Sequence, residues 1–71
     1  MSFNYNKLRG RIIERYGSQS AFASEFGISN NVFSKKMNSR IRFTTNDIIR
    51  IVNMLDIPES EIGEYFFTQK V

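Results

Sequence analysis

The sequence predicts a compact all-α domain of five helices over residues 1–71, and three observations lead to this prediction. A chain of 71 residues, 41% of them hydrophobic, has room for one thin core and no second domain. Apolar residues recur at spacings of three and four, the repeat of an α-helix, along most of the chain. Capping residues stand before these stretches, and only one Pro and four Gly interrupt them.

The first two helices are expected over residues 4–16 and 18–26. In the first, the apolar residues that share one face are Tyr5, Leu8, Ile12 and Tyr16. Gly17 suits a left-handed end for this helix, and Ser18 suits the cap of the next. In the second helix the expected buried face consists of Phe22 and Phe26, with Ala23 allowing a close approach. Gly27 should end that helix after about two turns.

The third helix should begin after Ser29 as N-cap and end near Asn38. Its apolar stripe is expected to be Val32 or Phe33, followed by Met37. Residues 39–43 have no helical period, so we expect a loop there.

A fourth helix should run to Leu55, capped by Thr44 together with Asp47 or by Thr45. Its core-facing stripe has the clearest period in the chain: Ile48, Ile51, Val52 and Leu55. The last helix is expected to start at Pro58. Its apolar side consists of Ile62, Tyr65 and Phe66.

Residues 18–38 carry the most specific pattern. Two short helices that cross steeply need a small residue at the crossing, a Gly with positive φ in the turn and an apolar residue that pins the second helix. Ala23, Gly27 and Phe33 fill these three roles. The pattern predicts a helix-turn-helix formed by the second and third helices. The alternative is an ordinary helical hairpin that serves only the core.

Charge is divided unevenly along the chain. Residues 1–45 hold eight basic and two acidic residues, a net charge of +6, and residues 46–71 hold two basic and five acidic residues, a net charge of −3. A concentrated positive potential attracts polyanions such as nucleic acid. Lysines and arginines that merely solvate helix faces would give the same count.

Several function classes are excluded by what the chain lacks. Without Cys or His there are no disulfides, no thiolate or imidazole catalysts and no usual ligands for a transition metal. Carboxylates show no pairing pattern and there is no Gly-rich phosphate loop, so we expect no cofactor and no catalysis. Arg50 and Asp56 interrupt the best apolar stretch, and no signal peptide is evident, so a cytoplasmic protein without membrane contact is expected.

Nearly the whole chain, through residues 4–12, 55–58 and 64–67, resembles the small Cro-like regulators of temperate bacteriophages, which belong to the lambda-repressor-like helix-turn-helix superfamily. It is also similar to the modulator-of-repression proteins that some of these phages encode beside their repressor. The resemblance implies a regulator of the lysis-lysogeny switch that works in the cytoplasm of the bacterial host.

The resemblance also implies a site on DNA. Gln19 should hold a phosphate and brace the third helix, while residues 29–38 enter the major groove with Ser29, Asn30, Asn31 and Ser34 facing base edges. Asn can pair with adenine, and Lys can reach guanine or a phosphate. The remaining candidate DNA contacts are Lys35, Lys36, Asn38, Arg40 and Arg42. Asn is also common after a helix cap, and the charged residues also fit a solvated face.

Two departures from the family weaken a role in DNA reading. Family members often have a Gly after the residue matched by Asn38, where this chain has Ser39, and a Ser is strained at positive φ. The third helix also has no arginine before Arg40, so it lacks bidentate guanine reading. Strong binding would then need a homodimer or another partner.

The end of the chain is acidic and aromatic. The residues that could contact a protein partner are Asp56, Glu59, Glu61, Glu64, Tyr65 and Phe67. The acidic side chains also fit a simpler role, because they stabilise the N-terminus of the last helix and solvate it. A sharper hypothesis is that this end contacts the basic DNA-reading face of another regulator.

Two function hypotheses follow. The first is a phage-type regulator that binds operator DNA through its helix-turn-helix and antagonises the phage repressor. The alternative is an antirepressor that forms a protein complex with the cognate phage repressor. Family and fold do not separate them, because function resides in the site and not in the scaffold.

Overall fold

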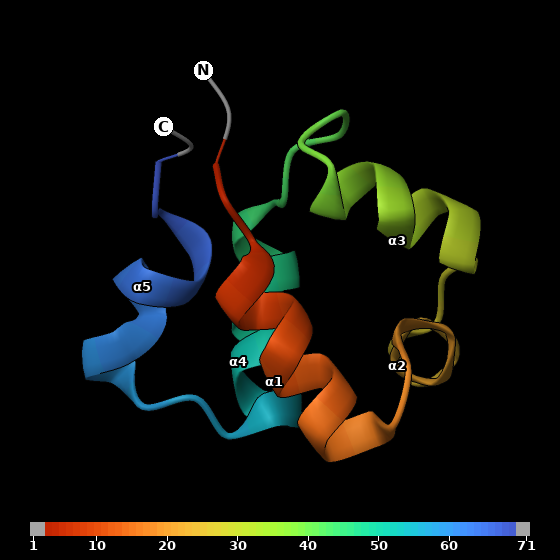
Figure 1. Ribbon diagram of the computed structural model, residues 1–71, viewed down its shortest axis with the longest axis horizontal. Helices are drawn as coiled ribbons and strands as arrows, with labels where there is room; N and C mark the ends of the chain where they lie inside the picture. Colours follow the sequence, from red (N-terminus) through yellow and green to blue (C-terminus); the bar gives the residue numbers. More distant parts are fainter. Residues whose placement is uncertain (1–2, 70–71) are drawn as a thin grey trace.

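A computed structural model of the chain describes residues 3–69. It contains five α-helices and one short 3-10 helix, shown in Figure 1: α1 (Asn6–Tyr16), α2 (Gln19–Phe26), α3 (Asn30–Met37), α4 (Thr45–Leu55), η1 (Glu59–Glu61) and α5 (Ile62–Phe66). Over the described residues the only β-structure is an isolated bridge between Phe3 and Gln69. The all-α fold with five helices is therefore confirmed.

Helix α1 lies at the centre of the molecule and packs against α2, α4 and α5. Helices α2 and α3 form one side, and η1 and α5 form the other (Figure 1). The two ends of the described chain lie side by side, because the Asn4 backbone N–H donates to the Thr68 carbonyl at 2.7 Å. This pairing closes the fold next to α3 and its following loop.

Serine and threonine caps start three of the helices at the expected positions. The side chain of Ser18 accepts a hydrogen bond from the Ala21 N–H, and that of Ser29 accepts one from the Val32 N–H. Thr44 and Asp47 form a complete capping box, which rules out the alternative cap Thr45.

The first and last helices differ from their predicted limits. Helix α1 begins at Asn6 instead of residue 4, because the Asn4 Oδ1 accepts from the Asn6 N–H and turns the chain before the helix. The single last helix expected from Pro58 is two pieces, η1 and α5. Pro58 stands just outside η1 with ψ 142°, an extended conformation from which a tight 3-10 turn leads into the α-helix.

One core cluster holds the helices together. Its largest fully buried side chains are Phe22, Phe26, Phe33, Phe66, Leu8, Ile12, Ile51 and Leu55. Tyr16 was expected in the core but is only partly buried, and its hydroxyl donates to the Met54 carbonyl at 3.4 Å. Tyr5 and Tyr65, which the sequence places on the apolar sides of the first and last helices, are 8% and 6% exposed and belong to this core.

Ser39 has a positive φ of 63°, a backbone conformation that a Gly would adopt freely. The left-handed region costs a residue with a Cβ about 1–2 kcal/mol, part of which Gly returns as entropy of the unfolded chain. We therefore expect Ser39→Gly to raise the free energy of unfolding by about 0.5–1 kcal/mol in urea titrations.

The matched control for Ser39→Gly is Ser24→Gly in the exposed interior of α2, which should destabilise by about 0.5–1 kcal/mol. The same substitution should thus raise the free energy of unfolding at position 39 and lower it at position 24. Loss of stability at Ser39 as large as at Ser24 would show that its hydroxyl, which donates to the Phe3 carbonyl at 3.4 Å, outweighs the strain.

Candidate partner-binding surfaces

The corner between α2 and α3 is built as the sequence predicts. Ala23 is fully buried at the crossing, and its carbonyl accepts from the N–H groups of both Gly27 and Ile28, at 2.9 and 3.1 Å. Gly27 has φ 98°, which only Gly adopts without strain, and Phe33 is fully buried against Phe22. These contacts hold α3 at a fixed angle on the outside of the molecule.

A single glutamine joins the two helices of this unit across their polar side. The Gln19 side-chain amide donates to the Ser34 Oγ at 2.9 Å and to the Asn30 Oδ1 at 3.2 Å. Gln19 thus braces α3, as expected for its position. The same hydrogen bonds occupy one polar atom each on Ser34 and Asn30, which leaves these two side chains less free to contact a partner.

Most of the candidate DNA contacts on α3 and beyond lie at the surface. The exposed ones are Ser29, Asn30, Asn31, Lys35, Asn38, Arg40 and Arg42. Ser34 is half-buried. Asn31 is exposed and makes no side-chain hydrogen bond within residues 3–69, so its amide is free to contact a partner.

Lys36 differs from its predicted role as a surface contact. Its ammonium donates to the Asp47 carboxylate at 2.9 Å, and the two side chains are only 12% and 16% exposed. It also lies 5.9 Å from the centre of the Phe43 ring. Lys36 is therefore a structural residue that ties α3 to the start of α4, and its charge is already compensated.

This ion pair gives the fold an acid-sensitive point. Burial alone would raise the pKa of the Asp47 carboxyl, but the hydrogen bonds from Lys36 and from the Thr44 N–H outweigh it and hold that pKa below its usual value. A lowered native pKa stabilises the fold above the unfolded pKa of about 3.9. That stabilisation is lost as the pH falls through the lower native value.

Asp47→Asn should therefore destabilise the protein by about 1–2 kcal/mol near neutral pH and reduce the further loss of stability on acidification below about pH 4. Urea unfolding from about pH 7 to pH 2.5 measures both effects. The control is Asp56→Asn, which removes an exposed carboxylate at the end of α4. An acid dependence of the Asp47 variant as steep as that of the unchanged protein would contradict this role.

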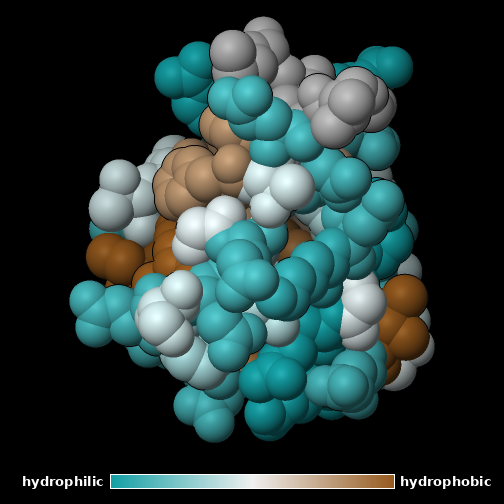
Figure 2. Space-filling model, turned by 60° about the vertical axis from the view of Figure 1, so that its left-hand side comes forward, coloured by the Kyte–Doolittle hydropathy of each residue, from teal (hydrophilic) through white to brown (hydrophobic). Residues whose placement is uncertain are grey.

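The acidic end surrounds η1 and α5. Asp56, Glu59 and Glu64 are exposed and Glu61 is half-buried. Lys7 lies among them, 3.2 Å from Glu64 and 3.9 Å from Glu61, and its hydrogen bond to Glu64 raises the pKa of Lys7. Figure 2 brings this side forward and shows that hydrophilic side chains cover most of it. Within residues 3–69, Lys7 thus pairs with Glu61 and Glu64, Arg11 donates to the Asp56 carbonyl at 3.2 Å, and Glu59 has no ion pair.

Two aromatic candidates at this end have different positions. Tyr65 is 6% exposed, and Lys7 lies 4.8 Å above its ring, so Tyr65 supports the surface from below and offers no free aromatic face to a partner. Phe67 is 53% exposed and meets Phe3 edge to face at 5.8 Å. Of the two aromatics, only Phe67 keeps the surface position expected for a partner contact.

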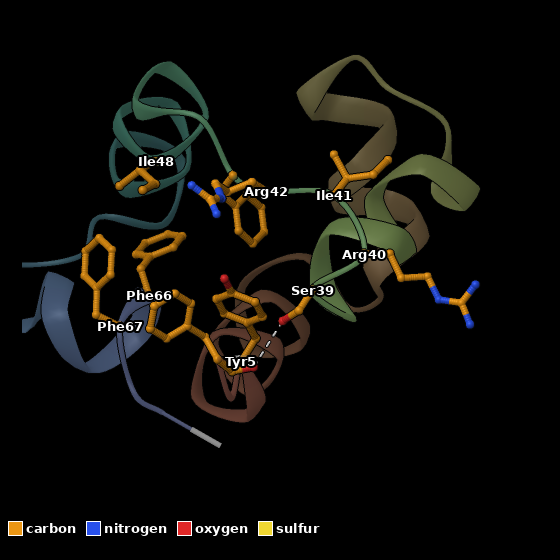
Figure 3. A pocket seen from close by; sticks show the side chains of 10 residues that line it. Tyr5, Ser39, Arg40, Ile41, Arg42, Ile48, Phe66 and Phe67 are labelled. Carbon is orange, nitrogen blue, oxygen red and sulfur yellow. Dashed lines mark hydrogen bonds between the residues drawn. The ribbon is translucent and has the colours of Figure 1, made fainter. Parts of the chain in front are cut away.

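Sequence reasoning missed a groove of about 610 Å³ between the loop after α3, the start of α4 and the two ends of the chain (Figure 3). It is lined by Phe3, Tyr5, Ser39, Arg40, Ile41, Arg42, Phe43, Ile48, Phe66 and Phe67. The residues come from four separate segments, so no local pattern signals the groove.

In the described residues no helix is long and apolar enough to cross a membrane, and no cluster of acidic side chains could hold a metal ion.

Comparison with known proteins identifies the family. The family described as "Protein of unknown function (DUF739)" matches residues 1–69. The chain therefore belongs to the DUF739 family. No curated protein sequence matches this DUF739 protein.

A solved structure resembles the DUF739 chain over its full length. This is the solution structure of the modulator of repression (MOR) of the temperate bacteriophage TP901-1 from Lactococcus lactis. The identity is 35%, the TM-score is 0.83, and the match covers 100% of this chain and 96% of the MOR chain. The DUF739 protein is thus homologous to a phage modulator of repression, and the predicted similarity to such proteins is confirmed.

Proposed function

We propose that this chain is a phage regulator of the lysis-lysogeny switch that acts by forming a complex with the cognate phage repressor. The observation that carries the proposal is its 35% identity to the TP901-1 modulator of repression along the whole chain. A protein that modulates repression needs a surface that the repressor recognises. It needs no operator-binding surface of its own.

The acidic end is the surface that we assign to this complex. Glu59 and Glu64 are exposed on η1 and α5, and Asp56 adjoins them at the end of α4. The DNA-reading face of a repressor must be basic because it binds phosphates. Opposite charge therefore directs the two surfaces together and blocks the face that would otherwise bind the operator.

The wider assignment follows from this proposal. We place the chain in the lambda-repressor-like helix-turn-helix superfamily, as one domain of residues 1–71 with a helix-turn-helix at about residues 18–38. It would act in the cytoplasm of the bacterial host, without catalysis. Support comes from the tight corner at Ala23 and Gly27 and from the exposed position of α3.

A gel-shift experiment on the phage's operator DNA tests the proposal. We expect the purified chain alone to give no shift, and expect it to release the repressor from the operator. A specific shift by the chain alone, with no change when repressor is added, would reject the protein complex in favour of operator binding.

Direct DNA binding is the second candidate, and the brace on α3 favours it. Gln19 fixes the helix while Asn31 and Lys35 stay exposed on it, an arrangement suited to the major groove. Arg40 and Arg42 follow α3, where they could bind phosphates. With no arginine on α3 itself, a homodimer on a symmetric operator would be needed for strong binding.

Under this second candidate, Asn31→Ala should cost about 1–3 kcal/mol of binding free energy on the specific operator and little on random DNA. Fluorescence anisotropy with both duplexes measures the difference. The matched control is Asn53→Ala on the exposed side of α4, which should change neither value. An equal loss on both duplexes would remove Asn31 from base reading.

A further inference from the structure

We propose that the groove between the loop of residues 39–43 and the two ends of the chain binds an acidic peptide segment that carries an apolar anchor side chain. This site carries the opposite charge to the acidic end and shares only Phe67 with the residues named there. Its inner surface is apolar and aromatic, and its unpaired polar groups suit an anion.

The apolar part of the groove is larger than one exposed side chain. Phe43 and Phe66 form its buried wall, with ring centres 5.7 Å apart and edge to face. Ile48 is half-buried beside them. Two of the most exposed large hydrophobic residues of the described chain, Ile41 at 39% and Phe67 at 53%, also line the groove. Apolar side chains gathered around a hollow mark a binding surface more than a solvated one.

Two polar groups of the groove, the Arg42 guanidinium and the Tyr5 hydroxyl, have no partner within residues 3–69, whereas the Ser39 hydroxyl donates to the Phe3 carbonyl at 3.4 Å. The ion pairs of residues 3–69 join other side chains, so none of the described carboxylates pairs with Arg42. In Figure 3 the Arg42 guanidinium is directed over the cavity, whereas that of Arg40 points away from it. The Tyr5 hydroxyl has no hydrogen-bond partner among the described residues, and burial raises the pKa of Tyr5, which keeps it a neutral donor.

These observations select a peptide over DNA and over a second copy of the chain. A carboxylate can pair with the Arg42 fork and accept from Tyr5 while a neighbouring apolar side chain covers Phe66 and Phe67. A phosphate backbone would use the arginine but leave the aromatic surface exposed to water. A second copy could offer only its acidic end to the groove, and these are two different surfaces. Contacts between different surfaces join copies into an open chain and not into a closed dimer.

The test uses a synthetic peptide with a central leucine–phenylalanine pair between glutamates, titrated into the isotope-labelled chain and followed by NMR. We expect saturable shifts at Tyr5, Ile48 and Phe67, and none with the peptide in which glutamine replaces glutamate. Arg42→Gln should weaken binding about tenfold, the equivalent of one charge-assisted hydrogen bond. The matched variant Arg40→Gln removes the same charge two residues earlier in the chain. It should change the affinity for the peptide less than about twofold.

Three results would overturn the proposal. The first is equal weakening by Arg40→Gln and Arg42→Gln, since it means that only the summed positive charge matters. The second is tighter binding of the groove to a short DNA duplex than to the peptide. The third is a change in the NMR shifts of the same residues when the free protein is diluted. Such a change would mean that a second copy of the chain occupies the groove. Unfolding curves of both variants exclude loss of fold as the cause of a change.

Discussion

Replacement of Phe33 by alanine should remove about half of the protein's free energy of unfolding. Phe33 is fully buried, and its ring lies 5.5 Å from Phe22 and 6.2 Å from both Phe26 and Phe43. Truncation of such a residue costs about 3–5 kcal/mol, while a domain of this size has a total stability of roughly 5–10 kcal/mol. We expect a fall in melting temperature of at least about 15 °C in circular dichroism.

The loss of stability in this variant also tests how α3 is held next to the loop that follows it. It is the residue of α3 that joins the α2–α3 corner to the loop carrying Arg42, through Phe43. The control is Ile49→Ala, which truncates a side chain that is 53% exposed and should change stability by less than about 0.5 kcal/mol. Similar melting temperatures for the two variants would mean that the aromatic cluster does not hold α3 in place.

Reversal of the acidic surface should have the largest effect on the interaction with the repressor. The double variant Glu59→Lys, Glu64→Lys exchanges two exposed carboxylates for ammonium groups where a basic partner is expected. Like charges at an interface cost several kcal/mol, so the affinity for the repressor should fall by about 100-fold. Surface plasmon resonance with immobilised repressor measures this, and most of the change should lie in the association rate.

A matched double variant separates the site from the overall charge. Glu14→Lys, Glu25→Lys makes the same change of net charge on α1 and α2, outside η1 and α5. It should alter the affinity by only a few fold, through long-range repulsion that salt screens. An equal loss for the two double variants would remove the acidic end as the specific contact.

Local features of this protein could be predicted from its sequence because they are decided within a few residues. Ser18, Ser29 and Thr44 each bond a backbone N–H three residues ahead, so a cap and its helix are visible together. Gly27 was expected at positive φ because the spacing of the two helices leaves no room for a longer turn.

Features that depend on distant segments could not be predicted in this way. The sequence suggests that Lys36, near the end of the third helix, is a free surface cation. In the structure, α4 brings the Asp47 carboxylate to its ammonium. The partner of the Tyr5 ring is likewise set by a distant segment, since Phe43 packs on it at 5.2 Å. The groove needs both ends of the chain and the loop after α3, so its lining shares no pattern along the sequence.

Ser39 is a third case, in which the residue type does not predict the backbone conformation. A Gly at this position would suggest a left-handed residue, and a Ser does not. The structure keeps the left-handed backbone with φ 63°, and two N–H groups beyond it, those of Arg40 and Ile41, bond the Lys35 carbonyl. Backbone hydrogen bonds thus hold Ser39 in a conformation that its own side chain disfavours.

The most direct test of the central claim is isothermal titration calorimetry of the chain with its cognate repressor in the absence of DNA. We expect a saturable interaction with fixed stoichiometry, which weakens when operator DNA is added, because both ligands occupy the same basic face of the repressor. Two observations together would contradict the claim. The folded chain and the folded repressor would give no binding heat at any of several temperatures, and the chain alone would bind the operator.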